Sequence, residues 1–355
     1  MDGKIYTAQA VIDLVDPQTV IQELCKHMRE HNAEISEESG DVLLRLSGCS
    51  ARFSADGAMT RINIEAPDFE HLYFARMTVA SHILEFAGET VPEICWNGDH
   101  GDAERPPNFQ TLTVTDTRDV TPHMRRITFR CENAARFANL DALHLNLLIQ
   151  QPGLAEPQWP FVGASGLIEW ERPDLKPSMR KYTVRSIDLA TSQLDIDFVL
   201  HADAGPGSSF AEAVTIGMEV GVLGPGGGGL MDADWYLFAG DETAIPAIAR
   251  MLENLPADSS GAAYLEVSDA AEIQNLQTPV AIGIHWLIRN AEKPGSLLVE
   301  ALRQTHRPQG DESIYLWAAC EFSAFKTIRQ LARQDWKLKN DQHLVVAYWR
   351  EGTKS

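Results

Sequence analysis

Two patterns of predicted strands follow one another along the chain, and their order restricts the possible folds more than any other feature. Between residues 111 and 225, apolar and polar residues alternate in six short runs bounded by turns: TLTVTDTRDV, MRRITFRC, LHLNLLIQQ, RKYTVRSID, QLDIDFVLHA and MEVGVLGP. Short antiparallel strands at this spacing predict a β-barrel. After the glycine-rich GPGGGG (224–229), strands such as WYLFAG, AAYLEVS and HLVVAYW alternate with helical segments such as AIPAIARMLENL and SAFKTIRQLARQ. This alternation predicts a parallel sheet flanked by helices.

A separate module precedes the barrel. After Asp16-Pro17, apolar residues recur with a helical period in VIQELCKHMREH, and a second helical pattern lies in FEHLYFARMTVASHILEFA. Between them, DVLLRLSG, CSARFSADG and AMTRINIEA alternate as strands do. NGDHGDAERPPN (97–108) has the composition of a linker. The sequence therefore predicts an α+β domain over residues 1–98, an antiparallel β-barrel over 108–230 and an α/β domain over 231–355.

Composition excludes several classes of function. The 355 residues include 30 basic and 50 acidic side chains, and a net charge of −20 disfavours binding to nucleic acid. No apolar run approaches the roughly 20 residues of a membrane span, and the charged N-terminal stretch lacks the apolar core of a signal peptide. The five cysteines are widely spaced and form no Cys-x-x-Cys pair, which favours a reducing compartment. We expect a cytoplasmic protein without nucleic-acid or membrane partners, and a monomer is one expected state.

The stretch RKYTVRS (180–186) concentrates positive charge around a Tyr-Thr pair in this acidic chain. On a strand, Arg180 and Tyr182 share one face, so the arginine can bind a phosphate while the ring packs beside a flat heterocycle. Thr183 adds a hydroxyl group near the end of that ring. The alternative is an exposed strand with an ordinary tyrosine on its core face, and this stretch alone leaves both interpretations open.

Two later segments favour ligand binding. DFVLHADAGPGSSFAEAV runs from a strand through a glycine-rich turn into a helix, whose free N–H groups would bind an anion, and we place Ser208 and Ser209 at its N-cap. His201, at the strand end, is compatible with a structural role. FAGDETAIPAIARML leads from an apolar strand into a helix at the edge where open α/β sheets bind ligands, although it lacks G-x-G-x-x-G. A well-capped structural helix is the weaker alternative, because the barrel motif precedes it.

Taken in this order, RxYT, H…GP.S, GDETAIPAI and the C-terminal YWREG resemble the siderophore-interacting flavoproteins, which are ferric-siderophore reductases of the ferredoxin-reductase-like group. The resemblance covers roughly residues 108–352 and implies an FAD-binding barrel followed by an NAD(P)-binding domain. Residues 1–98 resemble a small domain of unknown function, for which we infer no chemistry.

The resemblance implies roles by position. Arg180 would bind an FAD phosphate, Tyr182 would lie along the isoalloxazine ring and Thr183 would hydrogen-bond near its reactive nitrogen. Arg185 fits the second arginine of the longer motif. The residues that would hold the diphosphate are His201, Gly205, Pro206, Gly207, Ser208 and Ser209. Those that would meet NADH or NADPH are Gly240, Asp241, Glu242 and Thr243, and those that would close the flavin site are Tyr348, Trp349 and Arg350.

Departures from the family pattern concern mainly positive charge. Many relatives have Gly-Pro-Arg-Gly where this chain has an uncharged Gly226, and a lysine where it has Asn146. Because such cations help to hold an anionic ferric chelate, their absence predicts a preference for hydroxamate or carboxylate complexes. The remaining candidates for substrate binding are Arg350, Lys326 and Arg329. Cys320 stands where glycine is expected, and both a thiol near the nicotinamide and a buried free cysteine are open interpretations.

The implied activity is electron transfer from NADH or NADPH through FAD to Fe(III) in a ferric siderophore, with release of Fe(II). The flavin carries this chemistry, so no catalytic side chain and no resident metal are expected. A flavin reductase or diaphorase with another acceptor is one alternative, and a non-catalytic siderophore- or flavin-binding protein is another. Glu266 favours NADH weakly, because a carboxylate at the end of that strand can bond a ribose hydroxyl and repel a 2′-phosphate, although surface glutamates often end strands.

Overall fold

The structure is a computed structural model that describes residues 4–99, 105–154, 156–201, 205–308 and 310–353. It contains two compact units: the first comprises Met1–Phe109 and Leu154–Lys176, and the second comprises Gln110–Gly153 and Pro177–Ser355. Residues 154–176 thus pack with the N-terminal module, although they interrupt the predicted barrel. The predicted boundaries at 98, 108 and 230 stay predictions. Among the helices in the described part of the chain, none combines the length and the apolar character of a membrane span.

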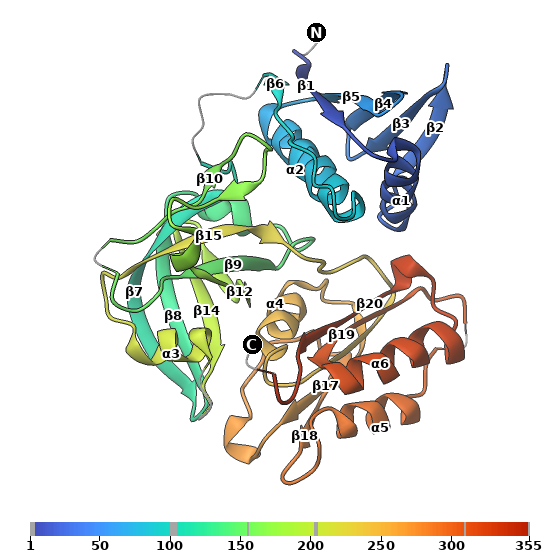
Figure 1. Cartoon of the computed structure of the whole chain (residues 1–355). Coiled ribbons are helices and arrows are strands. Elements are labelled where there is room, and N and C mark those ends of the chain that lie inside the picture. The colour runs from blue at the N-terminus through green and yellow to red at the C-terminus, as the bar shows by residue number, and fades with distance from the viewer. Residues whose placement is uncertain (1–3, 100–104, 155, 202–204, 309, 354–355) are drawn as a thin grey trace. The chain divides into compact units, whose positions relative to one another are not determined.

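The N-terminal module is an antiparallel sheet with two helices on one face (Figure 1). Every second residue of its first strand is buried (Ala8, Ala10 and Ile12), and these side chains share one core with Leu24 and Ile83 of the helices. The predicted helices and strands of this module are confirmed, and two further strands precede and follow the first helix. In the sheet order β2-β3-β4-β5-β1-β6, the elements are β1 (Tyr6–Asp13), α1 (Pro17–Glu30), β2 (Glu34–Glu38), β3 (Asp41–Leu46), β4 (Cys49–Asp56), β5 (Met59–Ala66), α2 (Phe69–Phe86) and β6 (Asn97–Gly98).

Both helices of the module begin at an aspartate. The side chain of Asp16 accepts a hydrogen bond from the backbone N–H of Thr19 (3.1 Å), and that of Asp68 accepts one from His71 (2.9 Å). Each bond satisfies one backbone donor that the first helical turn leaves free. These caps explain why the helices start where the periodic patterns predict.

Residues 154–176 form an excursion that the sequence pattern did not predict. They contain the two-residue strands β10 (Phe161–Val162) and β11 (Ile168–Glu169), which pair with each other, and a 3₁₀ turn, η2 (Pro173–Leu175). Trp96 of the N-terminal module holds this excursion. Its indole N–H donates to the carbonyl of Ser165 (2.7 Å) and its backbone N–H to that of Ala164 (3.3 Å).

The second unit begins with the predicted antiparallel barrel. Its sheet has the order β12-β9-β15-β7-β8-β14-β13, and the strands at the two edges, β12 and β13, are joined directly by Val184 and Arg185. The backbone N–H of Val184 donates to Leu143 (2.9 Å) and that of Arg185 to Asp195 (2.8 Å), so the sheet closes on itself. The elements are β7 (Phe109–Thr121), β8 (Met124–Cys131), η1 (Ala134–Phe137), β9 (His144–Ile149), β12 (Ser178–Thr183), β13 (Ser186–Asp188), β14 (Gln193–Val199), α3 (Pro206–Ala213) and β15 (Glu219–Gly226).

The α/β part is a five-stranded parallel sheet with the order β18-β17-β16-β19-β20, as predicted from the strand–helix alternation. After β16, the chain adds β17 and β18 on one side of that strand and then adds β19 and β20 on the other side. The strand order therefore reverses between β16 and β19. Ligands bind at such a reversal, outside the carboxyl ends of the strands. The elements are β16 (Trp235–Gly240), α4 (Ile245–Asn254), β17 (Ser260–Val267), η3 (Ala270–Glu272), β18 (Ile282–Ile288), α5 (Ser296–Gln304), β19 (Ile314–Glu321), α6 (Phe322–Gln330), the π-helical turn η4 (Leu331–Asp335), η5 (Asn340–Gln342) and β20 (His343–Trp349).

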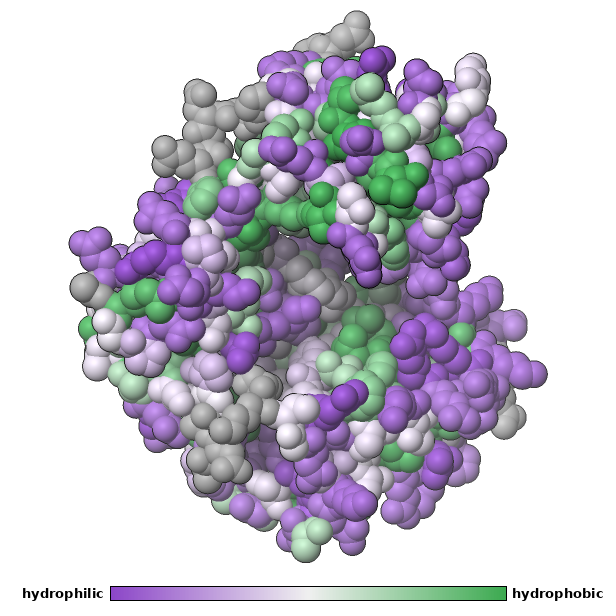
Figure 2. Space-filling view, viewed as in Figure 1, coloured by the Kyte–Doolittle hydropathy of each residue, from purple (hydrophilic) through white to green (hydrophobic). Residues whose placement is uncertain are grey.

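Helices α5 and α6 cover the sheet with one apolar stripe each. Leu298 and Leu302 of α5 and Ile328 of α6 are fully buried in a shared core. Hydrophilic residues cover the outward surface over these two helices (Figure 2). This division is what an amphipathic helix packed on a sheet requires.

Arg250 of α4 joins the α/β part to the barrel. Its guanidinium group is buried and donates to the backbone carbonyls of Val184 (2.9 Å), Phe137 (2.6 Å), Ala138 (3.3 Å) and Asn139 (3.4 Å). One side chain of the α/β part therefore satisfies carbonyl groups in two separate barrel segments.

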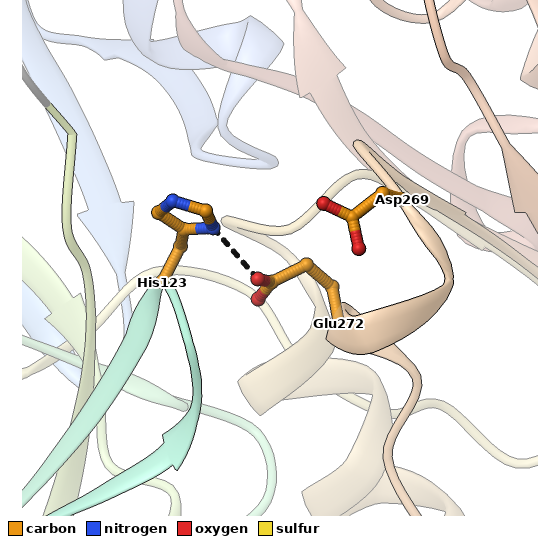
Figure 3. Close-up of side chains that lie close together, drawn as sticks. All are labelled: His123, Asp269 and Glu272. Carbon is orange, nitrogen blue, oxygen red and sulfur yellow. Dashed lines mark hydrogen bonds and ion pairs between the residues drawn. The ribbon is translucent and has the colours of Figure 1, made fainter.

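A second joint lies at the turn between β7 and β8. Glu272, a buried residue of η3, accepts hydrogen bonds from the hydroxyl of Thr121 (2.5 Å) and pairs with Nδ1 of His123 (2.7 Å; Figure 3). His123, Asp269 and Glu272 offer ligand atoms within 4.8 Å of one another. Since both oxygens of Glu272 already have protein partners, and Asp269 caps η3 through the N–H of Ala271 (2.7 Å), these contacts account for the cluster as a joint between the two parts.

We expect Arg250→Met to destabilise the protein by roughly 2–4 kcal/mol, because bonds to a charged group each contribute about 1.5–3 kcal/mol and the carbonyls lose their partner. Urea unfolding of the flavin-loaded protein measures this. Arg303→Met, at an exposed position of α5, is the matched control and should change stability by less than about 0.5 kcal/mol. Equal stability of the two variants would show that the joint is not essential.

Candidate functional site

The structure brings Arg180, Tyr182 and the first turn of α3 together. The Tyr182 ring packs at a tilt on Phe198, with ring centroids 4.3 Å apart, and a Cβ atom at Gly207 would lie 1.9 Å from the Tyr182 hydroxyl oxygen. Glycine is therefore required where α3 meets β12. Burial raises the pKa of Tyr182, so its hydroxyl stays protonated.

Arg180 has hydrogen-bonding capacity to spare. One terminal nitrogen donates to the carbonyl of Met179 (2.9 Å), while its Nε is buried without a protein partner. A buried donor without a partner is costly, and an anionic group would satisfy it. The arrangement fits the phosphate of FAD, for which the sequence predicts Arg180.

The prediction that serines cap α3 is wrong. Gly205 is the N-cap, and Ser208 and Ser209 lie inside the helix, which starts at Pro206. The Ser208 hydroxyl instead accepts a bond from the backbone N–H of His201 (3.3 Å), whose side chain is exposed. With no side chain at the cap, the N–H groups of the first turn are available to a diphosphate. Residues 202–204 of this turn lie outside the described residues.

Arg185, which the family pattern assigns to the cofactor site, has partners within the protein. Two of its nitrogens bind both carboxylate oxygens of Glu253 on α4 (2.6 and 2.8 Å), and its side chain is 8% exposed. This paired and buried geometry makes Arg185 a part of the joint with α4. Its assignment to the cofactor site stays a prediction.

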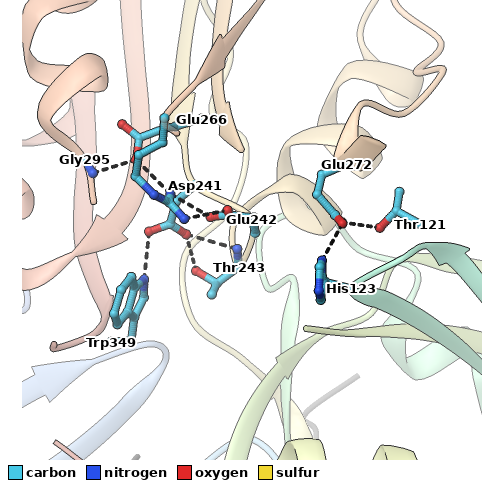
Figure 4. Close-up of polar contacts among 10 residues, drawn as sticks. Thr121, His123, Asp241, Glu242, Thr243, Glu266, Glu272, Gly295 and Trp349 are labelled. Carbon is cyan, nitrogen blue, oxygen red and sulfur yellow. Dashed lines mark hydrogen bonds and ion pairs between the residues drawn. The ribbon is translucent and has the colours of Figure 1, made fainter. Parts of the chain in front are cut away.

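Asp241 is the centre of the polar network at the carboxyl end of β16 (Figure 4). It is fully buried and accepts bonds from the backbone N–H and hydroxyl of Thr243 (3.0 and 2.5 Å) and from the indole N–H of Trp349 (2.8 Å). Burial raises the pKa of Asp241 to about 6, with the Thr243 and Trp349 bonds opposing and Glu242 adding to the rise. The network ties the predicted nucleotide loop to the C-terminal aromatic pair.

Two glutamates beside Asp241 share one arginine. Glu242 binds Arg289 (2.8 and 3.2 Å), and Glu266 binds both Arg289 (3.0 Å) and the backbone N–H of Gly295 (2.7 Å; Figure 4). Glu266 is fully buried, so it is not the surface glutamate considered in the sequence. Its second oxygen is buried without a protein partner, and the preference for NADH that it suggested stays a prediction.

The C-terminal aromatic residues are anchored on both sides of the site. The Tyr348 hydroxyl lies 2.6 Å from Nε2 of His144 on β9, and Trp349 is bonded to Asp241. Burial lowers the pKa of His144 to about 4, with Lys181 and Arg250 adding to the effect. Burial also raises the pKa of Tyr348. At neutral pH, therefore, the tyrosine donates and the neutral imidazole accepts. His144 was not among the predicted site residues, because the alternation of LHLNLL puts it on the same strand face as the polar Asn146, and its partner Tyr348 is 204 residues away.

The three predicted substrate residues gather around two rings of α6. The guanidinium of Arg350 lies 3.7 Å from the centroid of the Phe322 ring, and the Lys326 ammonium lies 5.0 Å from it. Arg329 lies 5.7 Å from the Phe325 centroid. Lys326 and Arg329 also line a shallow depression of about 240 Å³ on α6. These contacts hold the cations at the surface without neutralising them.

Cys320 is fully buried at the end of β19. Burial raises the pKa of its thiol, and Asp241, Glu266 and Glu321 raise it further. A thiol in these surroundings stays protonated, which favours the interpretation as a buried apolar cysteine over that of a reactive thiolate.

Comparison with known proteins places these residues in a family. Residues 113–229 match the siderophore-interacting FAD-binding domain, residues 233–352 match the siderophore-interacting protein model, and residues 9–97 match an uncharacterized protein conserved in bacteria (DUF2218). Ferric vibriobactin reductase ViuB of Vibrio cholerae is 31% identical over 236 residues, which are 66% of this chain and 86% of the relative. The chain belongs to the siderophore-interacting protein family.

Solved structures agree with this membership. A siderophore utilization protein from T. fusca is 37% identical, with a TM-score of 0.62 over 69% of this chain and 94% of that one. The siderophore-interacting protein SipS from Aeromonas hydrophila is 31% identical, with a TM-score of 0.59 over 69% and 93%. The predicted family, the FAD-binding barrel and the C-terminal α/β domain of this siderophore-interacting protein are confirmed. The residue assignments within the site stay predictions.

The assignment of Arg180 and Tyr182 is testable through flavin retention. Arg180→Ala should weaken FAD binding more than Tyr182→Ala, because a charge-assisted bond is about twice as strong as a neutral one and ring stacking adds only ~0.5–1.5 kcal/mol beyond buried area. FAD, identified by chromatography after heat release, is quantified before and after dialysis. Met179→Ala, at an exposed position of the same strand, is the control. Full flavin occupancy in both site variants would refute the assignment.

The raised pKa of Asp241 predicts a pH-dependent stability. The unfolded chain loses this proton near 3.8 and the folded chain near 6, so the stability conferred by the protonated group is present below 3.8 and is lost as the pH rises to about 6. Asp241→Asn cannot titrate. We compare the free energies of unfolding of the variant and the wild type. Their difference, variant minus wild type, should rise by roughly 3 kcal/mol between pH 3.8 and about 6 and then stay constant. The lost Trp349 bond shifts this difference by the same amount at every pH. Chemical denaturation across the window measures the trend, which a constant difference would contradict.

Proposed function

We propose that this protein is an FAD-dependent reductase that passes electrons from NADH or NADPH to the Fe(III) of a ferric siderophore and so releases Fe(II). The observation that carries the proposal is the anchoring of Tyr348 and Trp349 between the FAD-binding barrel and the carboxyl edge of β16, through His144 and Asp241. A relative that is 31% identical is named a ferric vibriobactin reductase. The family and the geometry together support a reductase over a binding protein.

When bound, FAD would supply the chemistry of hydride acceptance and single-electron transfer, so the protein has to position the partners and exclude water. Arg180 and the first turn of α3 would hold the phosphates, and the nucleotide would enter at the strand-order reversal between β16 and β19. Hard-oxygen chelators hold Fe(II) less tightly than Fe(III), and reduction therefore loosens the iron. One two-electron donor should yield two Fe(II) ions.

We infer that the reaction takes place in the cytoplasm, and the cysteines support this. All five are free, which fits a reducing compartment.

The decisive experiment is anaerobic reoxidation of the reduced protein by a panel of ferric chelates, with Fe(II) trapped by a chromogenic chelator. We expect two Fe(II) per NADH or NADPH consumed, at rates well above those of free flavin. Bleaching by the nucleotide without Fe(II) formation, but with rapid transfer to quinones or free flavin, would identify a diaphorase or flavin reductase. Absence of bleaching by either nucleotide would leave a binding function or another electron donor.

We expect positive charge around residues 146 and 226, the two positions where this chain lacks a cation that relatives often carry, to decide which ferric chelates bind best. Asn146 lies directly opposite Lys181 in the pairing of β9 with β12, and opposed residues share one face of a sheet. Lys181 is exposed. Its charge lowers the pKa of His144, although burial lowers that pKa more. We add Lys181 to the candidate substrate residues Arg350, Lys326 and Arg329, because it supplies a cation beside the position where relatives often carry lysine.

Gly226→Arg tests the role of charge at residue 226, the other position where this chain lacks a cation that many relatives carry. No atom lies within 4 Å of a Cβ built on Gly226, so the arginine has room. One added cation at an exposed entrance is worth roughly 1 kcal/mol, and KM for an anionic ferric triscatecholate should therefore fall about fivefold at low salt. KM for a near-neutral ferric hydroxamate should change less than about twofold.

Gly226→Gln is the control for size without charge and should leave both constants close to those of the wild type. Steady-state kinetics at two salt concentrations separates the electrostatic part, which salt weakens. An equal change for the two chelates, or a gain insensitive to salt, would show that residue 226 does not face the anionic substrate.

A further inference from the structure

Three histidines gather on the two helices of the N-terminal module, for which neither the sequence nor the family gives a role. His27 and His31 lie one turn apart on α1 and at its C-terminal end, and His82 lies on α2. The ring centroids of His27 and His31 are 4.9 Å apart, and those of His27 and His82 are 4.8 Å apart. His27 thus stands between two other imidazole rings that come from both helices.

The two rings of α1 face each other through their nitrogens. Nε2 of His27 and Nε2 of His31 are 3.3 Å apart. Two nitrogens bound to one tetrahedral zinc ion at about 2.0–2.1 Å are about 3.3–3.4 Å apart, so this spacing already has the value that a bound ion needs. Without an ion, one of the two nitrogens must donate to the other.

The third ring is oriented by the backbone. Nδ1 of His82 lies 2.7 Å from the carbonyl oxygen of Thr78, so Nδ1 carries the proton and Nε2 keeps its lone pair. A ring N–H bonded to a backbone carbonyl is the arrangement that metal-binding histidines commonly show, because it fixes the tautomer and raises the basicity of the other nitrogen. His82 therefore has the tautomer that a metal ligand requires.

The surroundings suit an exchangeable ion. His27 and His82 are half-buried and His31 is exposed, so the cluster opens to solvent. Phe86 packs beside His27 and His82, with centroids 6.3 and 6.1 Å away, and forms an apolar wall on one side. A simple stack of surface histidines would explain the ring contacts, but it would not require the orientation of His82.

We propose that His27, His31 and His82 form a binding site for a divalent first-row transition-metal ion. The Nε2 atoms of His27 and His31 provide two ligands. Nε2 of His82 provides the third once the side chains reorient, because the ligand atoms of the three histidines do not all lie within 4.8 Å of one another in the structure. Neutral imidazole prefers Zn²⁺, Cu²⁺, Ni²⁺ or Fe²⁺ over Mg²⁺ and Ca²⁺. Three protein ligands leave a fourth position for water, as in sites whose ion can react or exchange.

The test is calorimetric titration of the full-length, tag-free, flavin-loaded protein with Zn²⁺ after treatment with a chelator. We expect one ion per chain at this site and a rise in Tm on binding, because an ion that binds only the folded state stabilises it. Mg²⁺ at the same concentration should cause neither effect. An anaerobic titration with Fe²⁺ in competition with Zn²⁺ reports whether ferrous ion uses the same ligands.

Variants assign the ligands. His27→Ala and His82→Ala should each weaken Zn²⁺ binding at least tenfold and abolish most of the rise in Tm. His71→Ala, an exposed histidine on the same helix as His82, should leave both unchanged. His123→Ala separates this site from the His123, Asp269 and Glu272 cluster and should also bind Zn²⁺ as the wild type does.

Circular dichroism and the Tm without metal confirm that each variant is folded. Because the histidines are not fully buried, their replacement should leave the fold intact, so loss of binding would reflect loss of ligands. Unchanged Zn²⁺ affinity in His27→Ala or in His82→Ala would overturn the three-histidine site. Loss of binding in His123→Ala alone would transfer the ion to the other cluster and equally refute the proposal.

Discussion

The buried guanidinium group of Arg250 is the contact on which the arrangement of the second unit depends. Burial, and to a lesser degree Arg185, lowers its pKa to about 10, so it remains a cation at neutral pH and holds its carbonyl acceptors strongly. One acceptor is Val184, which follows the Tyr182-Thr183 pair that faces the flavin in the proposed site. Helix α4, which carries Arg250, begins just after Asp241. A single helix therefore fixes the distance between the predicted flavin motif and the predicted nucleotide loop.

Local pattern predicted the elements well and their side-chain partners poorly. The strands β8 and β20 coincide with the runs MRRITFRC and HLVVAYW, because alternation and flanking turns are properties of the segment itself. The N-cap of α3 and the environment of Glu266 were misjudged, since both depend on neighbours that are distant in the sequence. The excursion over residues 154–176 has little regular structure of its own, and its contact with Trp96 leaves no periodic signal.

The contacts around residues 226–229 show which of these glycines the packing requires. A Cβ at Gly227 would lie 2.7 Å from Nδ1 of His144, one at Gly228 would lie 2.7 Å from the Leu344 side chain, and one at Gly229 would lie 1.7 Å from the carbonyl oxygen of Leu140. These glycines allow the chain to pass close to β9 and β20 between the barrel and the α/β part. Gly226, by contrast, has open space around its Cβ position. Its lack of charge is therefore not imposed by packing, and the charge at this position can vary without a change in fold.

The carboxylates at the edge of the parallel sheet are better suited to hold geometry than to transfer protons. Asp241 accepts from Thr243 and Trp349, and Glu321 accepts from the backbone N–H of Ser323 (2.5 Å). Burial opposes the ionisation of Glu321, yet bonds from Ser323, Glu351 and Ala324 lower its pKa, and so its charge is stabilised by fixed donors. Moving a carboxylate that accepts several hydrogen bonds would break those bonds, which costs free energy. The edge therefore acts as a rigid frame for Trp349 and the nucleotide loop, which is what a reaction carried by a flavin asks of its protein.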